Sequence, residues 1–305
     1  MGKLKLVFVY VGVTIAMVCW SLSFIWYGDV YHFLSPFTTI LFRLVISGLI
    51  LFTVSFLTRQ LQKVSKADIK LFLLLALSEP FFYFIGESLG IQYVTPTVAA
   101  VMISLIPLLV PVFAYFILKE QIIKKNIVGI VISFVGVILV ILNKEYQFTA
   151  SLKGVLLMGL AVVSAVFYSI VLRKLASNYN PLTLISWQNS IGAVMFLPLV
   201  LLFEHDKLGQ IDFSFSSGMW VPLLNLSVFA SSIAFLLYTY SVQSLGAFKA
   251  NIFTNMIPVF TAGFSFYLLN EKLLFHNYIG ILLVICGLVL SQLKSIRKLR
   301  RNTKS

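Results

Sequence analysis

Residues 96–118 read PTVAAVMISLIPLLVPVFAYFIL, a run of 23 residues that contains no charged side chain. A helix needs about 20 mostly apolar residues to cross the ~30 Å hydrocarbon core of a bilayer. Similar runs extend outward in both directions, so that 60% of the 305 residues are hydrophobic and 11% are charged. A soluble domain has roughly 25% charged residues. The sequence therefore predicts an all-α integral membrane protein.

The apolar runs are separated by short segments that contain Gly, Pro or charged residues, which mark turns. This pattern predicts ten transmembrane helices, with successive helices packed as antiparallel neighbours. The predicted helices cover 6–27, 36–58, 71–93, 96–118, 126–142, 152–172, 181–203, 218–241, 247–269 and 276–293. No segment between them is long enough to form a separate soluble domain.

The chain also contains an internal repeat. A shift of 151 residues aligns 89–136 with 240–287, and 11 of the 48 aligned positions are identical. Farther upstream the shift is 145 residues, which aligns Pro36 with Pro181 and Arg43 with Gln188. Self-similarity on this scale indicates a duplicated unit. We therefore expect a first repeat at 1–146 and a second repeat at 147–305, each with five helices.

Because five is an odd number, the second repeat enters the membrane with the opposite orientation to the first. Inverted repeats give a protein two interconvertible arrangements of the same parts, one open to each side of the membrane. This is the structural basis of alternating access in secondary transporters. The repeat therefore favours a transporter of a small-molecule substrate.

Lys and Arg residues are distributed unequally between the two sides of the predicted helices. With the N-terminus inside, the cytoplasmic segments hold 18 of them and the opposite side holds four. Cytoplasmic loops of membrane proteins carry such an excess, so we expect a multi-pass protein of the cell (cytoplasmic) membrane with both termini cytoplasmic. The net charge of +13 lies in these loops and in the basic tail, where it faces lipid. It forms no separate basic domain, which argues against nucleic acid as a partner.

A series of short motifs runs through the first half, and part of it recurs in the second half. In the first half they are Trp20-Ser-Leu-Ser-Phe24, Pro36, Arg43, Gly90-Ile-Gln-Tyr-Val-Thr-Pro-Thr-Val-Ala-Ala100, Ile106-Pro107, Leu118-Lys-Glu120, Gly129 and Gly136. The second half has Ile257-Pro258, Asn270-Glu-Lys272, Gly280 and Gly287. With these two copies the chain resembles an EamA-type permease of the drug/metabolite transporter superfamily over essentially its whole length.

The resemblance implies a ten-helix fold with a central substrate cavity between the halves, in a bacterial cytoplasmic membrane. It also implies solutes such as amino acids, other metabolites, sugars or toxic organic compounds, usually exported. The second half departs from the pattern, because Ala165 replaces Trp20 and Gln188 replaces Arg43. Roles implied for the tryptophan and the arginine therefore apply to the first half only.

Three charged residues lie inside predicted helices: Arg43, Glu79 and Glu87. Charges at membrane depth are costly and usually face the protein interior or water. Arg43 and Glu87 fall at nearly the same depth in an antiparallel pair of helices, because a helix rises ~1.5 Å per residue. We hypothesise that they pair. The pair would serve either as a structural lock or in gating and substrate orientation.

Glu79 lies near the middle of the third predicted helix and is followed by Pro80, which bends a helix. Glu79, Tyr83 and Glu87 are spaced at i, i+4 and i+8, so they share one helix face. We expect this stripe to line the cavity. A carboxylate at this depth suits proton coupling or the binding of a substrate ammonium group. The alternative is a protonated glutamic acid that hydrogen-bonds at a helix contact.

Other polar or aromatic residues have two interpretations each. Trp20 would either stack on a substrate or mark the membrane interface, where tryptophan is enriched. Buried amides commonly join neighbouring helices by hydrogen bonds. The amides in the second half are Gln188, Asn189, Asn251 and Asn255. Of these, Asn255 is the preferred cavity residue because it precedes Pro258 by three positions.

The sequence also argues against several other functions. It has no H-E-x-x-H, G-x-S-x-G or Walker A motif, and its three histidines fall near predicted loops. We therefore expect no enzyme activity, no catalytic residue, no cofactor and no metal site. An uncoupled facilitator or channel, and a multidrug or organic-cation exporter, remain as alternatives to the metabolite exporter.

Overall fold

The computed structural model describes residues 3–118, 124–142, 150–246, 250 and 253–302. Every regular element in this part of the chain is a helix, which confirms the predicted all-α class. Seven helices in it are long and apolar enough to cross a membrane. Three shorter apolar helices cover Ile127–Ile141, Phe253–Leu269 and Phe275–Gly287. The apolar composition of these segments follows directly from the runs in the sequence.

The helices of the first half follow the predicted order, with two of the predicted segments interrupted. They are α1 (Lys3–Val30), α2 (Pro36–Leu57), α3 (Ile69–Ala76), the π-helical η1 (Leu77–Phe82), α4 (Tyr83–Gly90), α5 (Pro96–Ile103), α6 (Ile106–Leu118) and α7 (Lys124–Ile141).

The second half has a similar sequence of elements. They are α8 (Leu152–Leu175), α9 (Pro181–Phe203), the short α10 (His205–Leu208), α11 (Trp220–Leu224), the π-helical η2 (Asn225–Ile233), α12 (Ala234–Leu245), the 3-10 helix η3 (Phe253–Met256), α14 (Ile257–Leu269) and α15 (Phe275–Asn302). The predicted helix 247–269 is described only from residue 253 onward, apart from Ala250.

Prolines account for the interruptions in the first half. Pro107 has no N–H to bond the carbonyl of Ile103, so the predicted helix 96–118 breaks between α5 and α6. Pro80 likewise has no N–H to donate to the carbonyl of Ala76, and the third predicted helix becomes π-helical over η1. The second half is interrupted at corresponding places, by η3 just before Pro258 and by η2.

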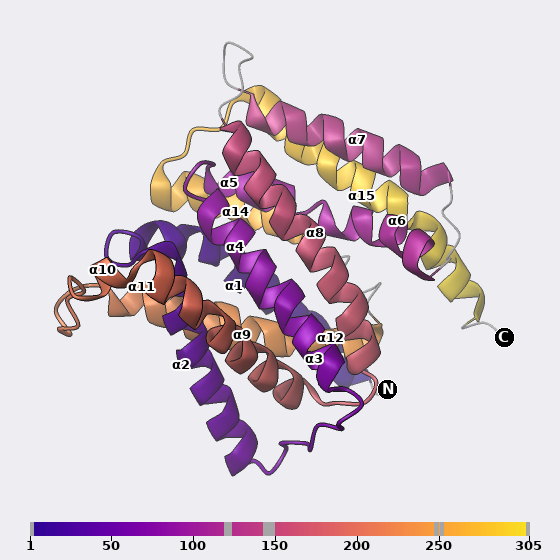
Figure 1. Ribbon diagram of the computed structural model, residues 1–305. Helices are drawn as coiled ribbons and strands as arrows, with labels where there is room; N and C mark the ends of the chain where they lie inside the picture. Colours follow the sequence, from indigo (N-terminus) through magenta and orange to yellow (C-terminus); the bar gives the residue numbers. More distant parts are fainter. Residues whose placement is uncertain (1–2, 119–123, 143–149, 247–249, 251–252, 303–305) are drawn as a thin grey trace.

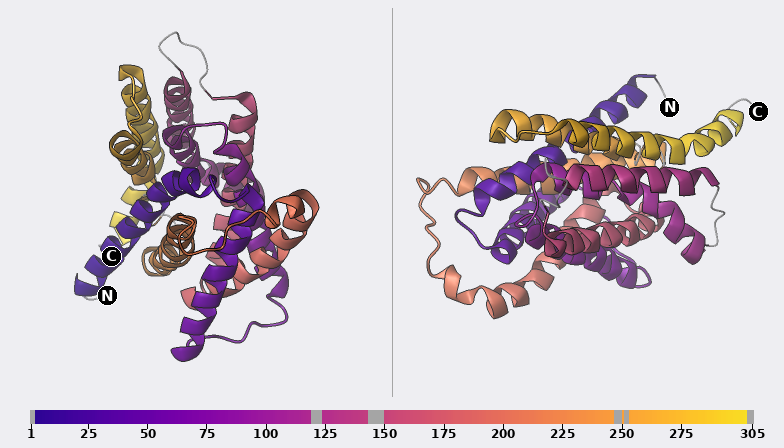
Figure 2. Two further views of the ribbon diagram at one scale, coloured as in Figure 1. Left: turned by 90° about the vertical axis from the view of Figure 1, so that its left-hand side faces the viewer. Right: turned by 90° about the horizontal axis from the view of Figure 1, so that it is seen from above.

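Equivalent helices of the two halves pack against each other in antiparallel pairs. α7 lies along α15, and all three views show them side by side (Figures 1 and 2). Ser133 of α7 donates a hydrogen bond to the carbonyl of Val284, its own equivalent in α15, at 3.1 Å. A Cβ on Gly136 would lie 2.6 Å from the carbonyl oxygen of Gly280, so only glycine permits this approach. The small residues of both helices therefore serve close packing.

α2 and α9 form the second antiparallel pair. Ser55 of α2 is 3.3 Å from Ser186 of α9, and Phe37 stacks near Phe203 at the other end. The remaining contacts also correspond: α1 packs on α12 and α14, while α8 packs on α4 and α6. The two halves are thus joined through equivalent surfaces, and the buried space lies between them.

Candidate functional site: a cavity between the two halves

A cavity lies at the junction of the halves. Its walls come from both halves of the chain, including α1, α2 and α4 of the first and α8, α12 and α14 of the second. The lining residues are Trp20, Ser23, Phe24, Arg43, Glu79, Tyr83, Phe84, Glu87, Ile103, Ile106, Ala165, Tyr168, Ser169, Phe235, Tyr238, Thr254 and Ile257.

The lining residues follow the internal repeat. All seven residues from the second half stand at positions equivalent to lining residues of the first half. The shift of 145 relates Trp20, Ser23 and Phe24 to Ala165, Tyr168 and Ser169, and the shift of 151 relates Phe84, Glu87, Ile103 and Ile106 to Phe235, Tyr238, Thr254 and Ile257. The first half adds Arg43, Glu79 and Tyr83, so every charged residue of the lining belongs to it.

Arg43 is 2% exposed, and its guanidinium is held by hydroxyl groups and an aromatic face. Nη1 donates to the hydroxyl of Tyr27 at 2.6 Å, and Nε donates to the hydroxyl of Ser231. Its central carbon lies 4.4 Å from the ring centre of Phe84, an arrangement that favours a cation. The side chain therefore joins α1, α2, η2 and α4 beside the cavity.

Glu87 and Arg43 are linked by hydrogen bonds through the hydroxyl of Tyr27. The Tyr27 hydroxyl donates to Oε2 of Glu87 at 3.0 Å, and the Tyr83 hydroxyl donates to Oε1 at 2.7 Å. Arg43 and Glu87 therefore belong to one buried network, but the direct ion pair that we hypothesised is absent between them. The reason is steric: a tyrosine from α1 occupies the position between the two charges.

Glu79 is 7% exposed and also lines the cavity. Its backbone leaves helical geometry, with φ −147° and ψ 117°, where η1 is interrupted. Within the described part of the chain its carboxylate accepts no hydrogen bond and meets no cation within ion-pair distance. Glu79, Tyr83 and Glu87 all face the cavity as the spacing predicts, although the helix between them is irregular.

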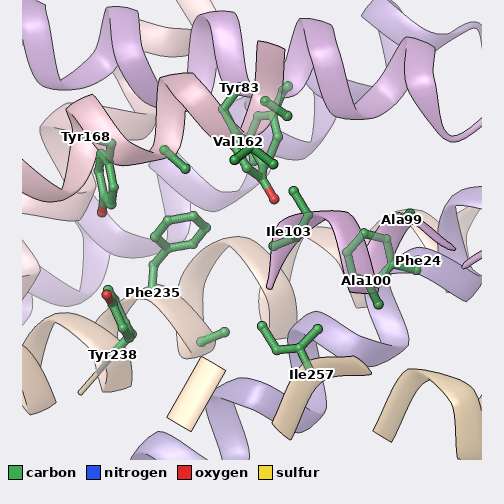
Figure 3. Close-up of a cluster of buried hydrophobic side chains, with 14 of the residues drawn as sticks. Phe24, Tyr83, Ala99, Ala100, Ile103, Val162, Tyr168, Phe235, Tyr238 and Ile257 are labelled. Carbon is green, nitrogen blue, oxygen red and sulfur yellow. The ribbon is translucent and has the colours of Figure 1, made fainter. Parts of the chain in front are cut away.

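Aromatic rings also line the cavity. Trp20 lies 5.1 Å from Phe235 and 5.2 Å from Tyr238 between ring centres, and Tyr168 lies 6.3 Å from Phe235. Figure 3 shows the hydroxyl groups of Tyr168 and Tyr238 pointing toward each other beside the Phe235 ring. Trp20 donates its indole N–H to the carbonyl of Ala230. Trp20 is also one of the residues that line the cavity.

Gln188 and Asn255, which we also considered as candidates for the substrate pathway, are not among the residues that line the cavity. Gln188 is fully buried and its amide has no hydrogen-bond partner in the described structure. Asn255 is buried in η3 and does not line the cavity. Asn189 joins helices as expected, donating to Ser47 at 2.7 Å. Asn251 lies outside the described residues.

Glu204 is a buried carboxylate that the sequence analysis did not single out. It follows α9 and accepts hydrogen bonds from the backbone N–H groups of Phe37 and Thr38 at the start of α2. A carboxylate stabilises a helix N-terminus in this way. Its rarity was a sign that the sequence offered, since Glu204 is one of only 10 acidic residues in the chain.

Comparisons with known proteins agree with this geometry. A model of the EamA-like transporter family matches residues 7–142 and 152–293, one copy in each half. The chain belongs to the EamA-like transporter family. This confirms the resemblance seen in the motifs, and it makes the protein a multi-pass membrane protein of a transporter family. The family also points to transport rather than enzyme activity.

Individual relatives of this EamA-like chain are named as transporters. An uncharacterized transporter of Archaeoglobus fulgidus is 26% identical over 92% of this chain and 96% of its own length. The uncharacterized transporter YyaM of Bacillus subtilis is 30% identical over 70% of each chain. One solved crystal structure superposes with a TM-score of 0.69 at 16% identity, covering 94% of this chain and 98% of its own, which is a likeness of fold.

Proposed function

We propose that the chain is a secondary carrier that exports a small organic solute by alternating access between its two repeats. The observation that supports this most is the cavity, to which both halves contribute residues at equivalent positions. Two repeats that line one cavity from opposite directions can open it to one side and then the other. The family resemblance favours an amino acid or a related compound.

The proposed topology has ten crossings, formed by the seven long helices and the three shorter ones. We divide them between residues 1–146 and 147–305 and place both termini in the cytoplasm. The antiparallel packing of α7 on α15 and of α2 on α9 supports opposite orientations of the two repeats, because equivalent helices then run in opposite directions. The Lys and Arg distribution supports the cytoplasmic termini.

Labelling from each side of the membrane tests this topology. In a variant with Cys19 and Cys286 replaced, single cysteines are placed by Gln121→Cys and by Lys272→Cys, which are equivalent positions in the two repeats. A membrane-impermeant maleimide should label Gln121→Cys from the cytoplasmic side and Lys272→Cys from the outer side. Labelling of both from the same side would rule out inverted repeats.

We assign a role in coupling to Glu79, because its carboxylate is buried and faces the cavity. The titratable and charged groups around it are Arg43, Tyr83, Glu87, Tyr168 and Tyr238. If Glu79 exchanges a proton during transport, Glu79→Gln should abolish the dependence of the transport rate on pH. An unchanged rate and an unchanged pH profile in this variant would exclude the role.

Counterflow distinguishes a carrier from an uncoupled facilitator. Proteoliposomes loaded with unlabelled phenylalanine or phenethylamine are given the labelled compound outside. A carrier should give saturable uptake that rises when the unlabelled compound is present on the opposite side. Flux that neither saturates nor responds to the opposite side would favour a channel-like permease.

A further inference from the structure

The two carboxylates of the cavity differ in how they are satisfied. Glu87 accepts hydrogen bonds from two tyrosine hydroxyls and belongs to the network of Arg43. Glu79 is only 7% exposed, and none of the described residues donates a hydrogen bond to its carboxylate. A buried carboxylate without a partner is strongly disfavoured when it is charged. Glu79 therefore provides an unused binding position for a positively charged group.

The cavity has no corresponding surplus of positive charge. Among the described lining residues Arg43 is the only cation, and it donates to Tyr27 and Ser231 and faces the ring of Phe84. Arg43 and Glu87 offset each other within one network, which leaves Glu79 as the surplus charge. The formal charge of the lining is therefore −1 when both carboxylates are ionised.

The remaining walls suit a flat apolar body. Trp20, Phe235 and Tyr238 pack with ring centres 5.1 and 5.2 Å from Trp20, and all three line the cavity. Aromatic faces attract cations as well as apolar groups, most strongly where water is excluded. An ammonium group near Glu79 would thus lie in a site where both the charge and the rings favour it.

We infer that the cavity selects organic amines: solutes with one ammonium group, bound by Glu79, on an aromatic or apolar body that packs against Trp20 and Phe235. The inference rests on the proposed function, since it takes this cavity as the site of the transported solute. It deepens that function by assigning the charge of the substrate. Amines should bind best, zwitterionic amino acids less well because their carboxylate adds a negative charge to a lining whose formal charge is already negative, and acids least.

Three ligands with the same ring test the order of affinities. Binding of phenethylamine, phenylalanine and 3-phenylpropionate is measured on the purified full-length protein by isothermal titration calorimetry. We expect phenethylamine to bind about tenfold more tightly than phenylalanine, because the amino acid buries an unpaired charge, and 3-phenylpropionate to give no measurable binding. Equal affinities, or tighter binding of either carboxylate compound, would overturn the inference without requiring any variant to fold.

Two variants then locate the charge. Glu79→Gln should weaken phenethylamine binding about tenfold or more, because the amide keeps the shape but loses the charge. Asp212→Asn is the matched control, since it removes one negative charge from the exposed loop between α10 and α11. The Ser214 backbone N–H lowers the pKa of that carboxyl, so the wild-type residue is charged in the assay. Equal effects of the two variants would show that only net charge matters and would refute the site.

Counterflow separates this inference from the proposed carrier. If phenylalanine or the acid binds and is exchanged while phenethylamine is not, the amine site is wrong and the carrier stands. If phenethylamine binds through Glu79 but nothing is exchanged across the membrane, the site stands and the carrier proposal fails. Exchange of phenethylamine that is lost in Glu79→Gln supports both.

Discussion

The two halves contribute the same positions to the cavity but different chemistry. Glu87 of α4 corresponds to Tyr238 of α12, and Trp20 of α1 corresponds to Ala165 of α8. The backbone arrangement is therefore repeated while the charges are confined to the first half. The comparison teaches that the duplication determines where the cavity lies, whereas later divergence determines what it can bind.

The helix pairs between the halves show the same contrast. α7 and α15 use glycines on both sides, so their contact is nearly symmetric. α2 and α9 differ at their equivalent positions 43 and 188: Arg43 donates hydrogen bonds to Tyr27 and Ser231, while the amide of Gln188 meets no partner at hydrogen-bond distance among the described residues. Equivalent substitutions in α7 and α15 should therefore lower the free energy of unfolding by similar amounts. Equivalent substitutions in α2 and α9 should lower it by different amounts.

The largest expected loss of stability comes from substitutions in the symmetric contact between α7 and α15. A Cβ on Gly136 would lie 2.6 Å from the Gly280 carbonyl, and one on Gly287 would lie 2.5 Å from the Gly129 carbonyl. Both oxygens are backbone atoms that cannot rotate away. Gly136→Ala and Gly287→Ala should each lower the free energy of unfolding by about 3 kcal/mol, at the upper end for overpacking. Unfolding in detergent, followed by circular dichroism, measures this.

Gly159→Ala is the matched control for this pair, because nothing lies within 4 Å of the Cβ that it would add to α8. An alanine there should leave stability unchanged or raise it slightly. A large loss in only one of Gly136→Ala and Gly287→Ala would contradict the symmetric packing of α7 and α15.

The second prediction tests the difference between α2 and α9. Arg43→Gln gives the first half the residue that the second half carries, and it leaves Glu87 buried without its cation. Breaking a buried charge network in this way should cost about 3 kcal/mol of unfolding free energy. The double variant Arg43→Gln/Glu87→Gln should recover most of that loss, because no unpaired charge remains.

The equivalent change in the second half should have little effect. Gln188→Leu removes no hydrogen bond of the described structure and nearly conserves volume, so it should alter stability by less than about 1.5 kcal/mol. Additive effects of Arg43→Gln and Glu87→Gln would show that the two side chains are energetically independent, despite their shared contact with Tyr27.

Sequence reasoning succeeded where a residue type is rare in a membrane. Arg43, Glu79 and Glu87 stand out as charges in apolar runs, and all three line the cavity. Tyr168 and Phe235 were missed because, among 13 Tyr and 28 Phe, an aromatic residue in a helix does not reveal whether it faces lipid or protein. The repeat does not identify them either, since their equivalents, Ser23 and Phe84, are not marked as cavity residues by the sequence.

Contacts between helices that are far apart in the chain could not be predicted from the sequence. The depth argument placed Arg43 and Glu87 close together, but it could not show that Tyr27 from a third helix separates them. Glu204 acts on the start of α2 from the end of α9, across 166 residues of chain. Such contacts depend on how helices are arranged in space, which hydrophobic periodicity does not specify.

The third prediction concerns the Tyr27 hydroxyl, which joins the two charges and has no counterpart in the second half, where Leu172 stands at the equivalent position. Tyr27→Phe removes one hydrogen bond to Arg43 and one to Glu87 while keeping the ring. Hydrogen bonds to charged groups contribute more than neutral ones, so the loss should be about 2 kcal/mol.

Tyr31→Phe is the matched control one helical turn away. Its hydroxyl donates only to the neutral carbonyl of Ser88, at 2.9 Å, so its removal should cost about 1 kcal/mol. Both values come from chemical unfolding of the purified variants. Adding Tyr27→Phe to the double variant Arg43→Gln/Glu87→Gln should cost less than it does in the wild type, because the charges that the hydroxyl serves are gone. An equal cost in both backgrounds would mean that Tyr27 stabilises the helix packing alone, and that the asymmetry of charge between the halves does not extend to α1.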